Sequence, residues 1–302
     1  MPRQLPAPPS KPVAYALLIV TMIIWASAFA GLRFVLRELD AFTLTVLRML
    51  IATGALVAMG LIFKTPLPEK RDLPEILGAG FLGFTLYHLA LNYGLEFVTA
   101  GQGSFIIATI PIWTSILAAR FLGERVTIKT WLGMGLGLLG VAYMSLEPGK
   151  MSISGGSFIV LFSALCAGGN MVLQKRLLSR YRALDVSVYA TVVGTVPLLF
   201  LLPSGIDAIA ELSTTGWLVT AYLGIVPIAI GYYLSTLAMN ALPANRTAQM
   251  LLLVPPIAAV IAWLTIGEEP GTKLVVGGPI ILAGVLLGNL ERKRKRAPKT
   301  SQ

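Results

Sequence analysis

One helical face of the segment 75–95 carries polar side chains that are suited to bind a solute. Thr85, His88, Asn92 and Glu96 fall within an arc of about 80° if successive residues turn by about 100°. Polar groups are costly in an apolar segment unless they face a cavity or one another. We therefore predict that His88 and Asn92 line a cavity for a small solute.

His88 is the single histidine of the chain. An ordinary histidine pKa lies near 6.5, which would allow this side chain to sense or carry protons. The alternative is a neutral histidine that donates one hydrogen bond and orients a neighbour, and both interpretations stay open. No Asp or Glu is expected at the middle of an apolar segment, so the sequence does not indicate a dedicated carboxylate proton relay.

Aromatic side chains form the second part of the predicted site. They lie deep in apolar segments, where an aromatic belt at a membrane interface does not account for all of them. Aromatic faces suit amphipathic or aromatic solutes and cations, although some of these rings are expected to face lipid or pack the core. Trp25 and Asn170 are expected to reach the same cavity. The predicted solute-binding residues are Trp25, Tyr87, His88, Asn92, Trp113, Asn170, Tyr232 and Tyr233.

The composition identifies the elements that must position these residues. Of the 302 residues, 56% are hydrophobic and only 13% are charged. A water-soluble protein carries about a quarter charged residues, so an ordinary soluble enzyme is excluded. Runs of about 17 to 25 apolar residues can cross a hydrocarbon core of about 30 Å as helices. Ten such runs are present, near 13–36, 41–63, 75–95, 100–121, 129–146, 156–178, 184–203, 214–238, 246–266 and 273–290.

The distribution of charge predicts how these spans are oriented. The net charge is +10, and most of the 24 Lys and Arg residues fall in alternate loops that share one face with both termini. Basic loops stay in the cytoplasm, so we predict a multi-pass protein of a bacterial-type inner membrane with both termini cytoplasmic. The basic tail 291–302 is interpreted as an anchor beside anionic lipid, in preference to a nucleic-acid site.

The chain is predicted to be an internal duplication. Residues 100–141 align with residues 244–285 without a gap, which pairs Pro111 with Pro255 and Gly123-Glu124 with Gly267-Glu268. Each copy has five spans, and an odd number forces the second copy to enter the membrane from the opposite face. Inverted repeats of this kind are typical of secondary transporters. The predicted division is an N-terminal segment 1–12, repeats 13–146 and 156–290, an external linker 147–155 and the tail 291–302.

Ten spans in two such halves resemble the EamA-type drug/metabolite transporter superfamily. The residues that carry the resemblance are Leu122-Gly123-Glu124 with Gly133 and Gly140, Ile266-Gly267-Glu268 with Gly277 and Gly284, and Trp25, Asp40 and Arg48 near the start. The segment Tyr87-His88-Leu89-Ala90-Leu91-Asn92-Tyr93 is most similar to the bacterial amino-acid exporter branch, including exporters of aromatic amino acids. The resemblance implies transport of small metabolites by alternating access.

Arg48 has two possible roles. Its guanidinium could bind a solute carboxylate through two parallel hydrogen bonds. Alternatively it extends toward the headgroups or pairs with Asp40 or Glu96. The structural role is favoured, because members of the resembled family carry a basic residue here irrespective of their substrate.

Prolines at matching positions of the two halves are predicted hinges. Pro111, Pro255 and Pro256 each remove a helical hydrogen bond and bend the helix. Symmetric bends beside a central cavity suit alternating access, whereas packing alone could also produce them.

The function predicted from the sequence is export of small metabolites, with amino acids as the expected class. The alternatives are transport of cationic drugs or nucleobases and, from another class, a receptor or assembly subunit that moves no solute. No motif of a hydrolase, metalloprotease or nucleotide-binding loop is found, and the one cysteine, Cys166, excludes an internal disulfide. We therefore expect no enzymatic activity, cofactor, metal or nucleic acid. The expected partners are a small solute and the bilayer, and a monomer suffices for the mechanism.

Overall fold

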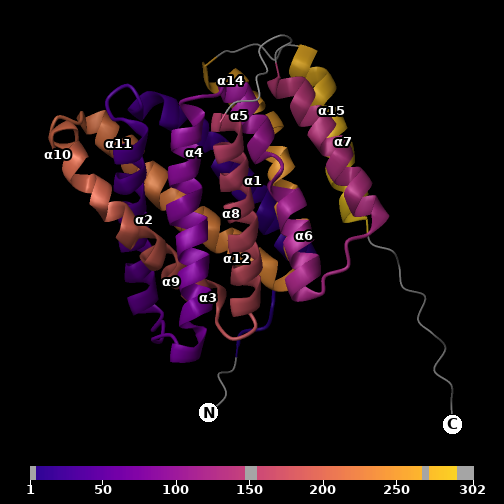
Figure 1. Cartoon of the computed structure of the whole chain (residues 1–302), viewed down its shortest axis with the longest axis horizontal. Helices are drawn as coiled ribbons and strands as arrows, with labels where there is room; N and C mark the ends of the chain where they lie inside the picture. Colours follow the sequence, from indigo (N-terminus) through magenta and orange to yellow (C-terminus); the bar gives the residue numbers. More distant parts are fainter. Residues whose placement is uncertain (1–4, 147–154, 267–271, 291–302) are drawn as a thin grey trace.

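Helices lie side by side in a bundle in the computed structural model (Figure 1), which describes residues 5–146, 155–266 and 272–290. Within these residues every regular element is helical. The first part of the chain forms α1 (Lys11–Val35), α2 (Ala41–Ile62), η1 (Lys70–Asp72), α3 (Leu73–Gly80), η2 (Phe81–Leu86), α4 (Tyr87–Leu95), α5 (Ala100–Ile107), α6 (Ile110–Leu122) and α7 (Ile128–Ser145). The second part forms α8 (Gly155–Leu177), α9 (Ala183–Thr195), η3 (Val196–Leu201), α10 (Leu202–Ala210), α11 (Thr214–Leu223), η4 (Gly224–Ile230), α12 (Gly231–Ala241), α13 (Ala244–Gln249), η5 (Met250–Leu253), α14 (Val254–Ile266) and α15 (Thr272–Asn289).

Eight helices of the described residues are long and apolar enough to cross a membrane. The two further predicted spans, near 75–95 and 129–146, are also helical, but they do not meet the same criteria of length and mean hydropathy. The first of them contains Glu75, His88 and Asn92, and the second begins beside Lys129. Polar residues lower the mean hydropathy of these helices, so the total of ten spans stays a prediction.

The start of α1 and the end of α15 lie on the same side of the bundle. Tyr15, near the start of α1, donates a hydrogen bond of 3.1 Å from its hydroxyl to the Asn289 side chain at the end of α15. Asn289 also donates to Gln249 of α13 at 3.3 Å. We call this side, at which α1 and α3 begin and α6 and α8 end, the basic end (Figure 1).

Two helices are interrupted by π-helical turns at corresponding positions. The segment η2 separates α3 from α4, and η4 separates α11 from α12. Extending the sequence register of the predicted duplication places η2 on η4 almost residue for residue. Wider turns of this type release backbone groups from the regular ladder and are frequent at functional sites. Pro227 inside η4 removes one donor and explains part of that distortion.

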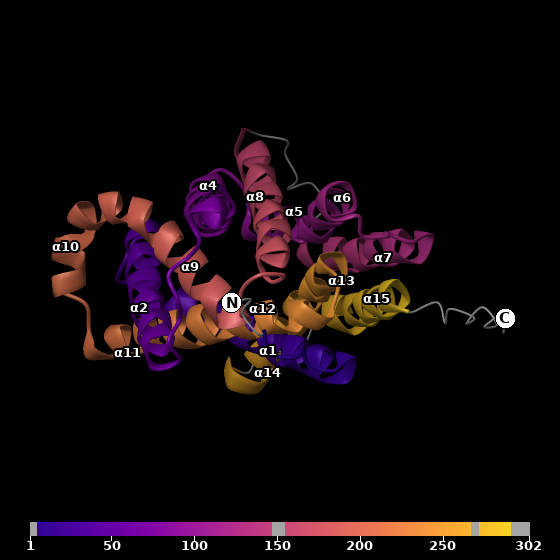
Figure 2. The same ribbon diagram turned by 90° about the horizontal axis from the view of Figure 1, so that it is seen from below.

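Helices α7 and α15 pack backbone against backbone at one edge of the bundle (Figures 1 and 2). A Cβ atom added to Gly133 would lie 2.5 Å from the Gly284 carbonyl oxygen. A Cβ atom added to Gly140 would lie 2.9 Å from the carbonyl oxygen of Gly277. Small residues permit this close approach, as they do between other membrane helices.

The remaining contacts between the two parts of the chain come in corresponding pairs. Helix α1 packs on α11, α12 and α14, whereas α8 packs on α3, α4 and α6. Helix α2 packs on η4, and α9 packs on η2. The first helix of each part therefore contacts the third and fourth spans of the other part, and the two π-helical segments lie at these contacts.

Candidate functional site

Arg48 of α2 lies within electrostatic range of three of the predicted solute-binding residues. Its carbonyl oxygen packs against η4, where a Cβ atom on Gly224 would lie 2.9 Å away. The phenols of Tyr87 and Tyr232 are electrostatic neighbours of the guanidinium, and the His88 imidazole lies within range of the same charge. Elements from both parts of the chain, α2, α4 and α12, therefore converge at this position.

Aromatic rings from three spans pack on one another in this cluster. The Tyr232 ring lies 5.3 Å from the Trp25 ring and 4.9 Å from the Phe84 ring, measured between centroids. The Tyr87 and His88 rings meet edge to face at 4.9 Å. The structure thus brings four predicted residues together, and it adds Phe84, which the sequence analysis did not identify.

Each π-helical segment is contacted by the first helix of the other part of the chain. The Trp25 indole nitrogen donates to the Pro227 carbonyl oxygen at 2.9 Å, so α1 satisfies an acceptor within η4. On the opposite side, Asn170 of α8 packs so closely on Gly83 of η2 that a Cβ atom there would collide with the amide. Trp25 and Asn170 therefore occupy comparable places, although one bonds to the backbone and the other packs on it.

Asn170 belongs to a buried chain of polar groups. The Gln174 side-chain amide donates to the Asn170 Oδ1 atom at 2.8 Å, and the Thr236 hydroxyl donates to the Gln174 Oε1 atom at 2.9 Å. This series of hydrogen bonds joins α8 to α12 and fixes the orientation of the Asn170 side chain. Buried polar side chains that are satisfied in this way stabilise the contact between helices.

Three predicted residues have their contacts elsewhere. Asn92 donates to the Ala41 carbonyl oxygen at 3.2 Å and to the Thr45 hydroxyl at 2.8 Å, which ties α4 to the first turn of α2. Trp113 packs on Gly168 of α8, and its indole nitrogen is buried without a hydrogen-bond partner. Tyr233 lies within electrostatic range of Arg182, near the start of α9.

The predicted hinge prolines lie where two helices are interrupted. Pro111 lies in the first turn of α6, directly after the break that follows α5. Pro255 and Pro256 lie in the first turn of α14, directly after the short 3-10 segment η5. A helix interruption therefore precedes the prolines at both positions, and a hinge movement there stays a prediction.

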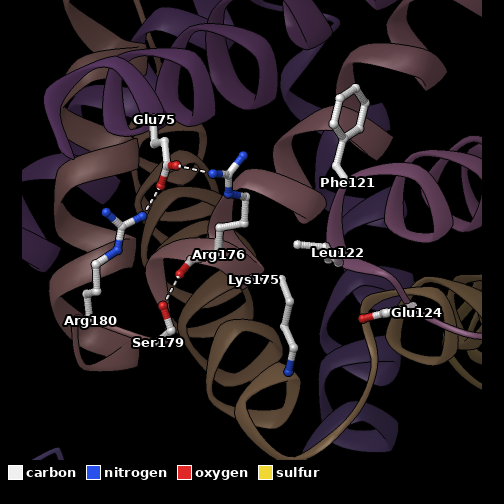
Figure 3. Close-up of a pocket in the computed structure, with 8 residues that line it drawn as sticks. All are labelled: Glu75, Phe121, Leu122, Glu124, Lys175, Arg176, Ser179 and Arg180. Carbon is white, nitrogen blue, oxygen red and sulfur yellow. Dashed lines mark hydrogen bonds and ion pairs between the residues drawn. The ribbon is translucent and has the colours of Figure 1, made fainter. Parts of the chain in front are cut away.

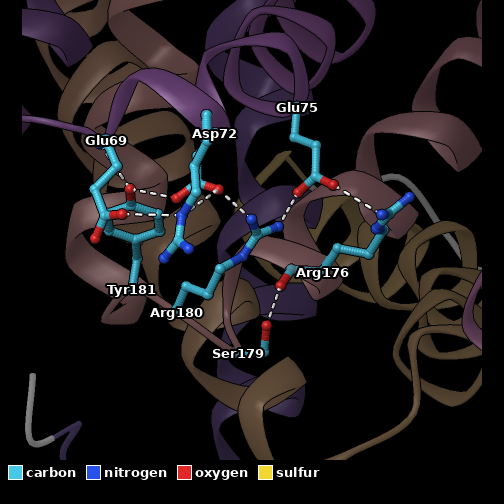
Figure 4. A network of polar contacts seen from close by, with 8 residues as sticks. Glu69, Asp72, Glu75, Arg176, Ser179, Arg180 and Tyr181 are labelled. Carbon is cyan, nitrogen blue, oxygen red and sulfur yellow. Dashed lines mark hydrogen bonds and ion pairs between the residues drawn. The ribbon is translucent and has the colours of Figure 1, made fainter. Parts of the chain in front are cut away.

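An ion-pair network joins the two parts of the chain at the basic end (Figure 4). Asp72, only 1% exposed, accepts a hydrogen bond of 2.7 Å from the Tyr181 hydroxyl and pairs with Arg180. Glu75 pairs with Arg180 and, at 2.9 Å, with Arg176. Burial and the hydrogen bond to Asp72 raise the pKa of Tyr181, so its hydroxyl stays protonated at neutral pH.

A neighbouring hollow of about 630 Å³ opens beside this network (Figure 3). Its lining residues are Glu75, Phe121, Leu122, Glu124, Lys175, Arg176, Ser179 and Arg180. Glu124 of the Gly-Glu turn accepts from the Ala244 and Asn245 amides at 2.7 and 3.1 Å and so caps α13. Lys175 donates to the carbonyl oxygens of Met239 and Leu242. Glu124 therefore links the two parts of the chain, whereas Lys175 ties α8 to the end of α12 within the second part. The other Gly-Glu turn, Gly267-Glu268, lies outside the described residues.

Comparison with known proteins places the chain among transporters. It matches the EamA-like transporter family over residues 12–146 and again over residues 154–290. A probable terminal-alkyne amino-acid exporter of Streptantibioticus cattleyicolor is 36% identical and is aligned over 92% of this chain and 95% of that protein. The uncharacterized transporter YdfC of Bacillus subtilis is 32% identical over 87% of this chain and 86% of that protein. A solved structure that is 17% identical shares the fold, with a TM-score of 0.74 over 91% of this chain and 96% of that one.

Proposed function

Because the chain belongs to the EamA-like transporter family and is a multi-pass membrane protein, we propose that it exports small metabolites, foremost amino acids, by alternating access. The proposed architecture is ten spans in two inverted repeats of five. The proposed location is a bacterial-type inner membrane, with the basic end and both termini in the cytoplasm. A monomer suffices for this cycle.

One observation carries the proposal. The polar and aromatic cluster at Arg48 is built jointly by α1, α2, α4 and α12, and it lies at the π-helical segments where the two parts of the chain meet. Two halves that contact each other through corresponding helices can exchange conformations, and this exchange opens a shared site to one side at a time. The paired contacts of α1 and α8 support such an exchange.

The substrate class rests on two further arguments. A relative that is 36% identical is named as a probable amino-acid exporter. The cluster combines one guanidinium with aromatic faces, a set that suits a small zwitterion with an apolar or aromatic side chain. A cationic drug would meet repulsion from Arg48, which makes it the less suitable solute. A non-transporting receptor would bind solute but would not move it.

Counterflow in proteoliposomes tests this function. Liposomes preloaded with unlabelled amino acids should accumulate radiolabelled threonine, methionine, lysine or phenylalanine above the level of protein-free liposomes. Tyr87→Ala and His88→Ala should each lower the initial rate by about threefold to tenfold, since each removes one solute contact. Tyr93→Ala is the matched control, because this neighbouring tyrosine of α4 is 48% exposed. Absence of flux for every amino acid from folded protein would reject the substrate class, and unchanged rates for both variants would remove α4 from the site.

A further inference from the structure

Arg48 has no acidic partner among the described residues. The Asp40 carboxylate is engaged elsewhere, since it accepts from the Phe42 and Thr43 amides at 2.9 and 3.0 Å and caps α2. These hydrogen bonds outweigh the effect of burial and lower the pKa of Asp40, which lies outside the span. Glu96 is exposed at the end of α4, and the structure gives it no pairing with Arg48. Neither pairing expected from the sequence is therefore formed.

The Arg48 guanidinium is also incompletely satisfied by neutral groups. Its Nε atom is buried without a hydrogen-bond partner, and the same holds for the Nε2 atom of His88, a residue that is 9% exposed. Arg48 lies two turns inside α2, where a charge without a counter-charge is costly. Unsatisfied polar groups of this kind in a native structure call for an explanation, and a ligand that completes their bonds is one.

Packing does not require an arginine at this place. In the other part of the chain the corresponding contact is made by Ala190 of α9, since a Cβ atom on Gly80 of α3 would lie 2.6 Å from the Ala190 carbonyl oxygen and equally close to Val193. The residue of α9 that takes the place of Arg48 in this contact is thus an uncharged alanine. The same close approach of helices is thus achieved without charge, which argues against a purely structural role for Arg48.

We propose that Arg48 is the carboxylate-binding residue of the transported solute, and this inference rests on the proposed function. The guanidinium presents a planar fork of donors that matches a carboxylate and provides the missing counter-charge. The phenols of Tyr87 and Tyr232 lie within electrostatic range of it and are hydrogen-bond donors that suit the same carboxylate. The rings of Trp25 and Phe84, both packed on Tyr232, are placed to contact the apolar part or the ammonium group of the solute. The solute class is therefore a small monocarboxylate with an apolar or aromatic side chain.

Pairs of ligands that differ only at the carboxyl group test this assignment on the unmodified protein. Thermal stabilisation of detergent-purified protein is measured with phenylalanine and phenylalaninamide, methionine and methioninamide, and 3-phenylpropionate and its amide. Each free acid should stabilise the protein, and each amide should need a concentration about tenfold higher or more for the same effect. Equal stabilisation by acid and amide, or none by any carboxylate, overturns the assignment.

Variants then separate binding from structure. Arg48→Gln should abolish the discrimination between acid and amide, and Arg48→Lys should keep part of it, because lysine retains the charge but not the planar fork. Arg37→Gln is the control, since Arg37 is exposed in the turn after α1. If Arg48→Gln only lowers the melting temperature and keeps the discrimination, Arg48 is structural. Carboxylate-dependent stabilisation without counterflow would reject the transport proposal alone, whereas counterflow with equal competition by the amides would reject this inference alone.

Discussion

Replacing Gly133 with leucine is expected to remove nearly all folded protein from the membrane. A Cβ atom at this position would lie 2.5 Å from both the Gly284 carbonyl oxygen and the Gly288 amide nitrogen. These are backbone atoms, so no side chain can move aside, and the two helices would have to separate over their whole contact. Overpacking that displaces backbone costs more than the few kcal/mol typical of a repacked core.

Gly135→Leu is the matched control on the same helix. Gly135 is exposed, and nothing lies within 4 Å of the position that a Cβ atom would take. Both variants should be expressed with a fluorescent tag and compared by size-exclusion chromatography after solubilisation. A monodisperse peak of normal height for Gly133→Leu would show that the α7–α15 contact is not required for folding.

A covalent link across the ion-pair network is expected to stop transport almost completely. Glu75 belongs to α3 and Arg176 to α8, and their side chains pair at 2.9 Å. If the basic end opens to the cytoplasm during the cycle, these helices have to separate there. Glu75→Cys and Arg176→Cys should therefore be combined in a Cys166→Ala background, which removes the one native thiol. A cleavable thiol cross-linker should block counterflow, and cleavage should restore the flux.

The control for this experiment is a cross-link within one part of the chain. Glu69 and Arg71 pair at 2.9 Å in the same loop before α3. Glu69→Cys with Arg71→Cys should accept the cross-linker without loss of flux, because no helices are tied together. Full counterflow after complete cross-linking of positions 75 and 176 would mean that this end does not open between α3 and α8.

Much of the candidate site could be predicted from residue type and depth. Trp25, Tyr87, His88 and Tyr232 are polar or aromatic residues in apolar segments, and the structure gathers them around Arg48. Their depth predicts that each needs a partner or a cavity, since polar groups in hydrocarbon are costly without one.

Other features could not be derived from one sequence. Phe84 carries no polar atom, so nothing marks it as part of the site until its ring is seen 4.9 Å from Tyr232. The π-helical segments arise from packing between distant helices and leave no periodic signal. In the sequence Arg176 and Arg180 are only two of the many basic residues near span ends, yet they pair with Glu75 of α3 and Asp72 of η1. Such pairings depend on tertiary contacts between residues about one hundred positions apart in sequence.

The helix interruptions could be predicted only in part. Proline alone predicts a bend at positions 111 and 255, and in the structure a helix is interrupted just before each of them. For Asn92, the sequence identifies the helix face but not the bonding partners. It lies on the polar face that the sequence indicates, but its amide is bonded to Ala41 and Thr45. Spacing therefore identifies the face of a helix, whereas neighbouring helices decide whether a polar group faces a solute or the protein.

Accessibility of the central site from each side of the membrane tests alternating access most directly. His88→Cys in the Cys166→Ala background provides a single thiol in the cluster. It should be exposed to a membrane-impermeant methanethiosulfonate reagent in right-side-out and in inside-out vesicles. Alternating access predicts that the thiol reacts from both sides, that a transported amino acid slows both reactions, and that locking positions 75 and 176 abolishes reaction from the basic end only. Reaction from one side alone, unaffected by the amino acid, would contradict the account.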